Sequence, residues 1–351
     1  MISNEAFVFM LGTVLAGLVC WACKRLPEER WQFIASVPIM KDANGRWVGL
    51  NFTYYGLLTA NALVFGVAIL IVLFGALQVP VVVTLGLVVA VLAFCLPAAK
   101  WVARWVEGKQ CTFTIAGAFF VGIIVAPAAI VILNTQLPRL NLASLPIIPS
   151  LAAIMIAYGF GEGLGRLACI SFGCCYGVTV GDAHPLLQRV FDRWNFVFSG
   201  QMKKISYASG LEGKRVIPIQ ALTALLYIAV GLIATSLYLN NSFTAAFILS
   251  MVITQGWRVF SETLRADYRG VGAISAYQIL GLLAVVFAIS LSGLVPTEQT
   301  ATAQLTLGLE TVWQPIVLLS LQALWAIVFV MFGKSMVTGA EISFHLHQDR
   351  I

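Results

Sequence analysis

Two short segments of this chain place arginine and glutamate at spacings that could bind an anion. In residues 161–166, Glu162 and Arg166 are four positions apart, and Gly165 directly precedes the arginine. Side chains four apart lie on one face of a helix and can form an ion pair, while glycine lets a backbone or a ligand approach closely. We interpret this segment as a binding site. The alternative is that Arg166 only anchors the end of a helix.

The second segment, residues 258–270, carries charged side chains along one side of a predicted helix. Intervals of four, three and four residues form a stripe that suits a phosphate group or buried ion pairs. The stripe consists of Arg258, Glu262, Arg265 and Arg269. Glu262 lies between two arginines, whereas Glu162 has Arg166 as its one expected partner, so we expect loss of Glu262 to be more damaging. The alternative interpretation is a structural ladder of salt bridges.

The seven cysteines form no recognisable disulfide framework. Cys174 and Cys175 are adjacent, so a disulfide between them would be strained, and we expect both to be packed in the interior rather than to act as nucleophiles. Cys20 and Cys23 have the C-x-x-C spacing of many metal ligands but lie in an apolar run, where packing is the expected role. We therefore predict no metal site, and no cofactor is expected.

The elements that carry these segments are expected to be membrane helices. Of the 351 residues, 60% are hydrophobic and 10% are charged, against about a quarter charged in soluble domains. This composition excludes a water-soluble fold. Apolar runs of about 17 to 25 residues can cross a hydrocarbon core of about 30 Å as helices. We predict an all-α polytopic membrane helix bundle of about nine transmembrane helices, at roughly 6–23, 52–77, 80–97, 113–133, 146–165, 218–239, 243–260, 272–294 and 312–333.

The basic residues are distributed unevenly between the two faces of this bundle. Of the 21 lysines and arginines, Arg139 alone falls in a loop on the second face, so the positive-inside rule places the first face in the cytoplasm and the N-terminus outside. The net charge of +6 is scattered through loops between apolar segments, where anionic lipid is the expected partner and nucleic acid is not. Lys24 and Arg25 follow the first apolar run, the reverse of a signal peptide, so this helix is expected to be retained.

The longest loop on the basic face, residues 169–217, mixes charged, aromatic and glycine residues and is predicted to form a small folded head. We divide the chain accordingly. Residues 1–46 are an added N-terminal helix and loop, residues 47–295 are a membrane core that includes the head, and residues 296–351 are an added C-terminal helix and tail.

Several motifs resemble the prolipoprotein diacylglyceryl transferase family. Residues 165–177, which begin Gly-Arg-Leu-Ala-Cys and end Gly-Cys-Cys-Tyr-Gly, are similar to the signature of a divergent branch. The Arg-x-x-x-Glu-x-x-Arg block at 258–265 resembles the family's penultimate helix, residues 54–57 resemble the opening of its first helix, and Pro218-x-Gln220 is similar to its His-Pro-x-Gln motif. The resemblance covers about residues 47–295, a seven-helix core with one helix added at each end.

This resemblance implies a multi-pass transferase of the bacterial inner (plasma) membrane. It would move a diacylglyceryl group from an anionic phospholipid, phosphatidylglycerol in the family, to a lipoprotein thiol or a different acceptor, releasing glycerol phosphate. The implied catalytic residues are Arg166, Arg258 and Glu262. The implied substrate-binding residues are Tyr55, Glu162, Arg265, Arg269, Gly165 and Gly177.

The chain departs from the family pattern at its histidines. Residues 113–116 read Phe-Thr-Ile-Ala where the family has Phe-His-Gly-Gly, and His184 lies in the predicted head, where we expect it to be solvated. A second hypothesis therefore stays open: a catalytically inactive lipid-binding or scaffold subunit that retains the fold. A transporter is a weaker alternative, because polar residues gather at one face rather than at the middle of the membrane.

Overall fold

The structure is a computed structural model that describes residues 3–107, 115–267, 274–295 and 302–351. Within these ranges, nine helices are long and apolar enough to cross a membrane, which confirms the predicted all-α polytopic bundle. They are α1 (Asn4–Arg25), α2 (Tyr54–Ala76), α3 (Val81–Glu107), α4 (Ile115–Gln136), α5 (Ile147–Phe172), α8 (Ile219–Leu239), α9 (Phe243–Glu262), α10 (Ala276–Leu294) and α12 (Pro315–Gly333).

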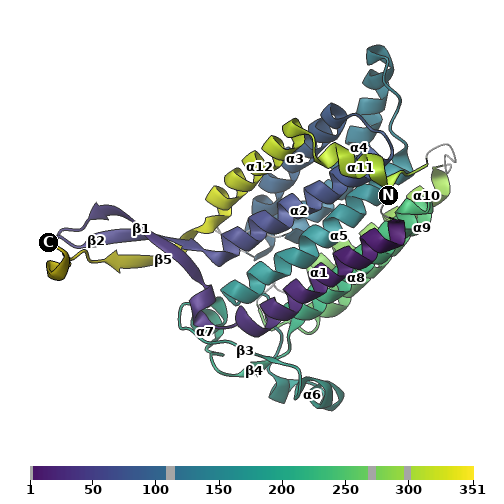
Figure 1. Cartoon of the computed structure of the whole chain (residues 1–351). Helices are drawn as coiled ribbons and strands as arrows, with labels where there is room; N and C mark the ends of the chain where they lie inside the picture. Colours follow the sequence, from purple (N-terminus) through teal and green to yellow (C-terminus); the bar gives the residue numbers. More distant parts are fainter. Residues whose placement is uncertain (1–2, 108–114, 268–273, 296–301) are drawn as a thin grey trace.

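Helix α5 lies at the centre of the bundle and packs against α2, α8 and α9 (Figure 1). Of its most apolar window, 78% is buried, against 17% for α1, α4 and α12. The outer helices pack in pairs, α3 with α4, α9 with α10 and α12 with α2, while α1 lies along α8. Charged side chains on α5 are therefore shielded from both lipid and water.

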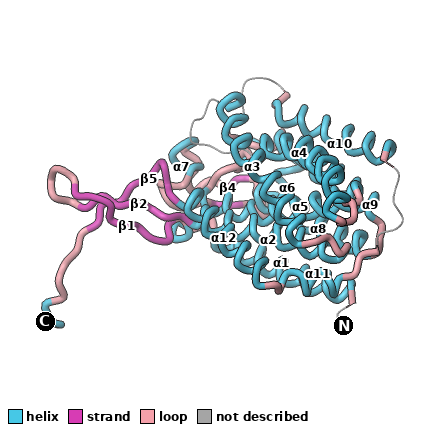
Figure 2. Tube along the Cα trace, turned by 90° about the horizontal axis from the view of Figure 1, so that it is seen from above, coloured by secondary structure: helices cyan, strands magenta, loops and turns pink. Residues whose placement is uncertain are grey.

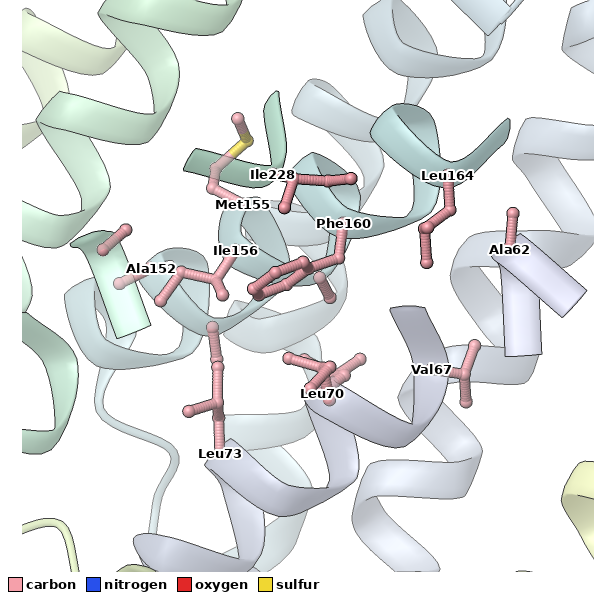
Figure 3. Close-up of a cluster of buried hydrophobic side chains, with 14 of the residues drawn as sticks. Ala62, Val67, Leu70, Leu73, Ala152, Met155, Ile156, Phe160, Leu164 and Ile228 are labelled. Atoms are coloured by element: carbon pink, nitrogen blue, oxygen red, sulfur yellow. The ribbon is translucent and has the colours of Figure 1, made fainter. Parts of the chain in front are cut away.

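The core between α2, α5 and α8 is filled by aliphatic side chains around Phe160, whose side chain is fully buried (Figure 3). Leu70 and Leu73 of α2 and Ile228 of α8 surround this ring. Gly66 permits the close contact of α2 with α5, because a Cβ there would lie 2.9 Å from the carbonyl oxygen of Ala157. Small residues at helix crossings are typical of membrane bundles, where packing provides most of the attraction.

Two helix ends differ from the predicted limits. Helix α3 was predicted to end at Pro97 but continues to Glu107 with the proline inside it, and this prediction was wrong. Membrane helices tolerate internal proline because the freed backbone groups find other partners within the bundle. Helix α5, predicted to end near 165, continues to Phe172 and ends where Gly173 adopts a left-handed conformation with φ of 71°.

A three-stranded antiparallel sheet projects from one end of the bundle (Figures 1 and 2). Its strands are β1 (Phe33–Lys41), β2 (Trp47–Thr53) and β5 (Lys334–Ile342), in the order β1-β2-β5. Trp47 is paired with Lys41 on one side and with Ile342 on the other. Residues 33–41 were predicted as a loop, residues 52–53 as the start of a helix and residues 334–342 as a tail, so the sheet was not foreseen.

The predicted head follows α5 at the same end of the bundle as the sheet (Figure 1). It contains η3 (Val180–Asp182), α6 (Pro185–Phe191), the paired strands β3 (Phe196–Val197) and β4 (Arg215–Val216), and α7 (Lys204–Ser209). The buried Lys203 ties it to the bundle, because Nζ donates to the carbonyl oxygens of Ser171 at 2.6 Å and Leu26 at 3.1 Å. The remaining short helices are η1 (Glu29–Trp31), η2 (Leu137–Leu140), α11 (Leu305–Val312) and η4 (Gln348–Arg350).

Candidate functional site

Two arginines from different helices share one buried carboxylate. Glu162 on α5 accepts a hydrogen bond from Nη2 of Arg166, one turn further along α5, and the same Oε1 atom lies 3.5 Å from Nη2 of Arg258 on α9. Nη1 of Arg258 also donates to the hydroxyl of Tyr158 at 3.3 Å. The exposed fractions are 3% for Glu162, 8% for Arg166 and 7% for Arg258, so this cluster is enclosed by protein. We call Glu162, Arg166 and Arg258 the charged triad.

The structure corrects one sequence-based assignment within this group. The Glu162–Arg166 pair was predicted from its spacing and is confirmed. The expectation that Glu162 has one arginine partner was wrong, because α9 packs against α5 and brings Arg258 to the same carboxylate. Spacing within one helix cannot reveal a contact between two helices.

Arg265 lies beyond the end of α9 and has carboxylate partners of its own. Its Nε and Nη2 atoms donate to the two oxygens of Asp267 at 2.7 and 2.8 Å, a bidentate arrangement. Nη1 lies 3.5 Å from Oε1 of Glu262. Arg265 and Glu262 thus belong to a second ion-pair group at the exit of α9. Arg269, the other substrate-binding residue expected here, lies outside the described residues.

The charged triad carries more positive than negative charge. Two guanidinium groups face one carboxylate, and each arginine keeps its charge at any physiological pH. Nε of Arg166 and Oε2 of Glu162 are buried and have no hydrogen-bond partner within the part of the chain that the structure describes. A buried ion that lacks full compensation is costly in a membrane interior. The triad is therefore suited to bind an anion that accepts hydrogen bonds.

The two segments singled out from the sequence meet at the end of the bundle. Gly177 and Arg265 form an antiparallel bridge, and the neighbouring backbone bonds are Val178 N to Leu264 O at 3.0 Å and Ala266 N to Tyr176 O at 3.1 Å. The loop after α5 and the chain after α9 therefore pair like short strands. The sequence predicted that both segments lie on the basic face of the bundle. The backbone pairing shows that they are also in direct contact.

Two glycines expected to bind substrate have different surroundings. A Cβ at Gly177 would lie 2.6 Å from the carbonyl oxygen of Ile217, so the close approach of two backbones requires glycine there. A Cβ at Gly165 would meet nothing within 4 Å, so this position borders open space beside Arg166.

Tyr55 reaches the same region from α2. Its ring packs against Phe172 at the end of α5, with 5.5 Å between the ring centroids. The hydroxyl lies within electrostatic range of Arg166 and of the thiols of Cys169 and Cys174. The structure thus brings the tyrosine expected from the resemblance close to the charged triad.

Three cysteines cluster next to this tyrosine. The sulfur atoms of Cys169, Cys174 and Cys175 all lie within 4.8 Å of one another, and none of the three is in a disulfide within the described residues. The pKa of Cys174 is raised well above its ordinary value because its thiol shares hydrogen bonds with Cys169 and Cys175 and is buried. Cys174 and Cys175 are adjacent in the sequence, but the approach of Cys169 to this pair was not predicted.

Tyr158 was not singled out from the sequence, and Gln220 was named only as part of the motif Pro218-x-Gln220, without a role in the site. Tyr158 lies four residues before Glu162, which was a sufficient signal that both share one helix face. Gln220 is fully buried, and its amide nitrogen donates to the carbonyl oxygen of Cys174 at 2.8 Å. This bond connects the start of α8 to the loop that follows α5.

The histidines lie away from the charged triad. His184 is exposed, as expected, and its Nδ1 atom accepts a hydrogen bond from Leu186 N at 3.4 Å at the start of α6. His345 and His347 are exposed in the C-terminal tail. Residues 113 and 114, within the segment that replaces the family's histidine motif, lie outside the described residues.

Comparison with models of known protein families finds no match to this chain. Comparison with curated proteins also finds none. We therefore infer the function from the geometry of the charged triad and from the resemblance of the motifs.

Proposed function

We propose that this membrane protein is a phospholipid-dependent transferase, and that the charged triad binds the phosphate of its lipid substrate. One observation carries the proposal: Arg166 and Arg258 converge from two helices on a single buried carboxylate oxygen and leave a surplus positive charge. Guanidinium groups bind phosphate oxygens with paired, charge-assisted hydrogen bonds. An anionic phospholipid, such as phosphatidylglycerol, would present such a phosphate while its acyl chains stay in the bilayer.

In this proposal the two arginines are the catalytic residues, because they would contact the phosphate that leaves. Glu162 holds both guanidinium groups in position. Tyr55 and the open space at Gly165 lie where the substrate would enter. Glu262 and Arg265 keep the chain after α9 against the loop after α5, a positioning role in place of the catalytic role expected for Glu262.

The reaction class implied by the resemblance is diacylglyceryl transfer. A nucleophile on the acceptor, a thiol in the family, attacks the glycerol carbon that carries the phosphate. A new sulfur–carbon bond forms while the carbon–oxygen bond to phosphate breaks, and glycerol phosphate leaves with the bonding electrons. The thiol proton passes to a base or to water. Arginines that gain contact as negative charge develops on the leaving group stabilise the transition state.

A second candidate is a lipid-binding subunit without catalytic activity. The observation in its favour is that His184, His345 and His347, the three histidines of the chain, lie in the head and the tail, outside the nine helices. A triad that binds phosphate tightly but lacks a base would retain a lipid without turning it over.

One experiment separates these functions. Lipid that copurifies with the detergent-solubilised protein is identified by mass spectrometry, and release of glycerol phosphate is measured after adding phosphatidylglycerol and a peptide with a lipobox cysteine. Retained anionic lipid together with release supports the transferase. Retained lipid without release supports the lipid-binding subunit. If the protein retains no lipid and releases no glycerol phosphate, the assignment of a phosphate site is wrong. The matched control is Arg215→Ala, which lies in the exposed pair with Asp192.

A further inference from the structure

The chain turns back directly after α5 and brings the thiols of three cysteines close together. Cys169 lies in the last turn of α5, and the backbone N–H of Cys174 donates to its carbonyl oxygen at 3.0 Å. This return is possible because Gly173 and Cys175 both have left-handed backbones, with φ of 71° and 59°. A cysteine in this conformation is uncommon and is maintained only where the surroundings require it.

The spacing of the sulfur atoms fits a single metal ion. Three thiolates each about 2.3 Å from one central ion in a plane are about 4.0 Å apart. The observed sulfur atoms lie within 4.8 Å of one another, so a contraction of less than 1 Å would complete the geometry. Thiolate ligands select soft ions, of which Cu(I) and Zn(II) are the common biological examples.

We propose that Cys169, Cys174 and Cys175 together bind one thiophilic metal ion, Cu(I) or Zn(II). Cu(I) is satisfied by three thiolates, whereas Zn(II) would keep a fourth position open for water or substrate. The inference goes beyond the proposed transferase and does not depend on it. It also departs from the expectation of no metal, which considered Cys174 and Cys175 without Cys169.

Positively charged side chains near the three cysteines can compensate the negative charge of a metal–thiolate complex. Three thiolates leave two negative charges in excess with Cu(I) and one with Zn(II), and a buried anion must be compensated. Arg166 is within electrostatic range of Cys169, and it belongs to the triad that has one cation in excess. Lys204 faces both Cys174 and Cys175. Arg265 also faces Cys175, but its one positive charge is opposed by the two carboxylates of Glu262 and Asp267, so it contributes no surplus cation.

The test measures metal binding by the full-length protein in detergent. After reduction and treatment with a chelator under anaerobic conditions, the protein receives Cu(I) or Zn(II) alone, and bound metal is counted by mass spectrometry after gel filtration. We expect one ion per chain. Affinity is then measured by competition, with bicinchoninate for Cu(I) and with pyridylazoresorcinol for Zn(II), and the two arms decide which ion is preferred.

Serine variants locate the site. Because loss of an outer-shell contact costs about 10- to 100-fold in metal affinity, we expect loss of a ligand in Cys169→Ser or Cys174→Ser to weaken binding more than about 100-fold. The matched control is Cys20→Ser with Cys23→Ser, which removes the other closely spaced cysteines and should bind metal like the wild type. Cys175→Ser, at a half-buried position, provides a further variant should the buried substitutions prevent folding.

X-ray absorption of the loaded wild-type protein gives a readout that needs no variant. Three sulfur neighbours at about 2.3 Å support the proposal for either ion. It is overturned if the wild-type protein with all thiols reduced binds neither ion, if binding follows Cys20 and Cys23 instead, or if absorption shows fewer than three sulfur ligands. Each of these outcomes is distinct from loss of lipid binding, so the transferase proposal is tested separately.

Discussion

Nη2 of Arg258 on α9 lies 3.5 Å from Oε1 of Glu162 on α5, the oxygen that also accepts from Arg166. One carboxylate thereby holds two helices together and prevents two buried guanidinium groups from facing each other without compensation. Glu162 is therefore the member of the charged triad whose loss should lower the stability of the fold most, because it is the partner of both arginines.

Glu162→Gln should therefore destabilise the protein more than Glu262→Gln, the reverse of the expectation from the sequence, because Glu162 and not Glu262 is shared by the two buried arginines. Removing the shared carboxylate leaves two buried arginines uncompensated, and breaking a buried ion pair costs about 3 to 5 kcal/mol. After Glu262→Gln, Arg265 still has both oxygens of Asp267, at 2.7 and 2.8 Å. Thermal unfolding in detergent, followed by circular dichroism, should show the larger drop in melting temperature for Glu162→Gln. Equal drops would contradict the shared-carboxylate arrangement.

Arg166→Ala and Arg258→Ala should each abolish most of the binding of anionic phospholipid. A hydrogen bond to a charged group contributes about 1.5 to 3 kcal/mol, so each loss should weaken lipid retention by about 10- to 100-fold. Lysine should restore it only in part, because an ammonium group lacks the planar pair of donors. Retained lipid is quantified by mass spectrometry, with Arg215→Ala as the exposed control. Wild-type retention in both alanine variants would exclude a phosphate clamp.

The membrane helices and the Glu162–Arg166 pair could be predicted because both depend on local sequence. Apolar runs determine where a helix crosses a bilayer, and a spacing of four places two side chains on one helix face. The contact of Arg258 with Glu162 depends on how α9 packs against α5, which no interval in the sequence encodes. The same limit explains why Cys169 was not grouped with Cys174 until the turn at Gly173 was known.

The sheet was missed for a related reason. Strand β1 is exposed at every position after its first, so it lacks the alternation of buried and exposed residues by which a strand is recognised, and β5 alternates only between half-buried and exposed positions. Strand β5 pairs with β2 although nearly the whole chain separates them, and this pairing cannot be read from either segment alone.

Because of Lys203, the stability of the folded protein should change with pH in the alkaline range. Burial lowers the pKa of this lysine to about 8, although the carboxylate of Glu29 acts in the opposite direction. A lysine in the unfolded chain has a pKa of about 10.4. Between these values the unfolded chain holds a proton that the folded protein has released, so stability should rise as the pH increases from about 8 to about 10.4. Melting temperatures across this range should show the rise in wild type and a flatter profile in Lys203→Met.

The exposed Lys214→Met is the control for this experiment, and it should keep the wild-type slope. A rise that persists unchanged in Lys203→Met would assign the pH dependence to another group.

The head should lie on the cytoplasmic side, as the distribution of lysine and arginine predicts. A cysteine at Lys214, exposed in the head, should be protected from a membrane-impermeant maleimide in intact cells and labelled after lysis. A cysteine at Asn240, exposed at the opposite end of α8, should show the reverse pattern. Labelling of the head position in intact cells would place the charged triad within reach of an external acceptor, such as a lipoprotein thiol.

Strand β2 is completed only by β5, which comes from the last part of the chain (Figure 1). During synthesis β2 emerges before α2, yet its second edge stays unpaired until α12 and then β5 have been synthesised. Assembly of the sheet thus waits until all nine of the described membrane helices have been synthesised. A product that stops before Lys334 would present an open strand edge, which is a known site of unwanted pairing with other chains.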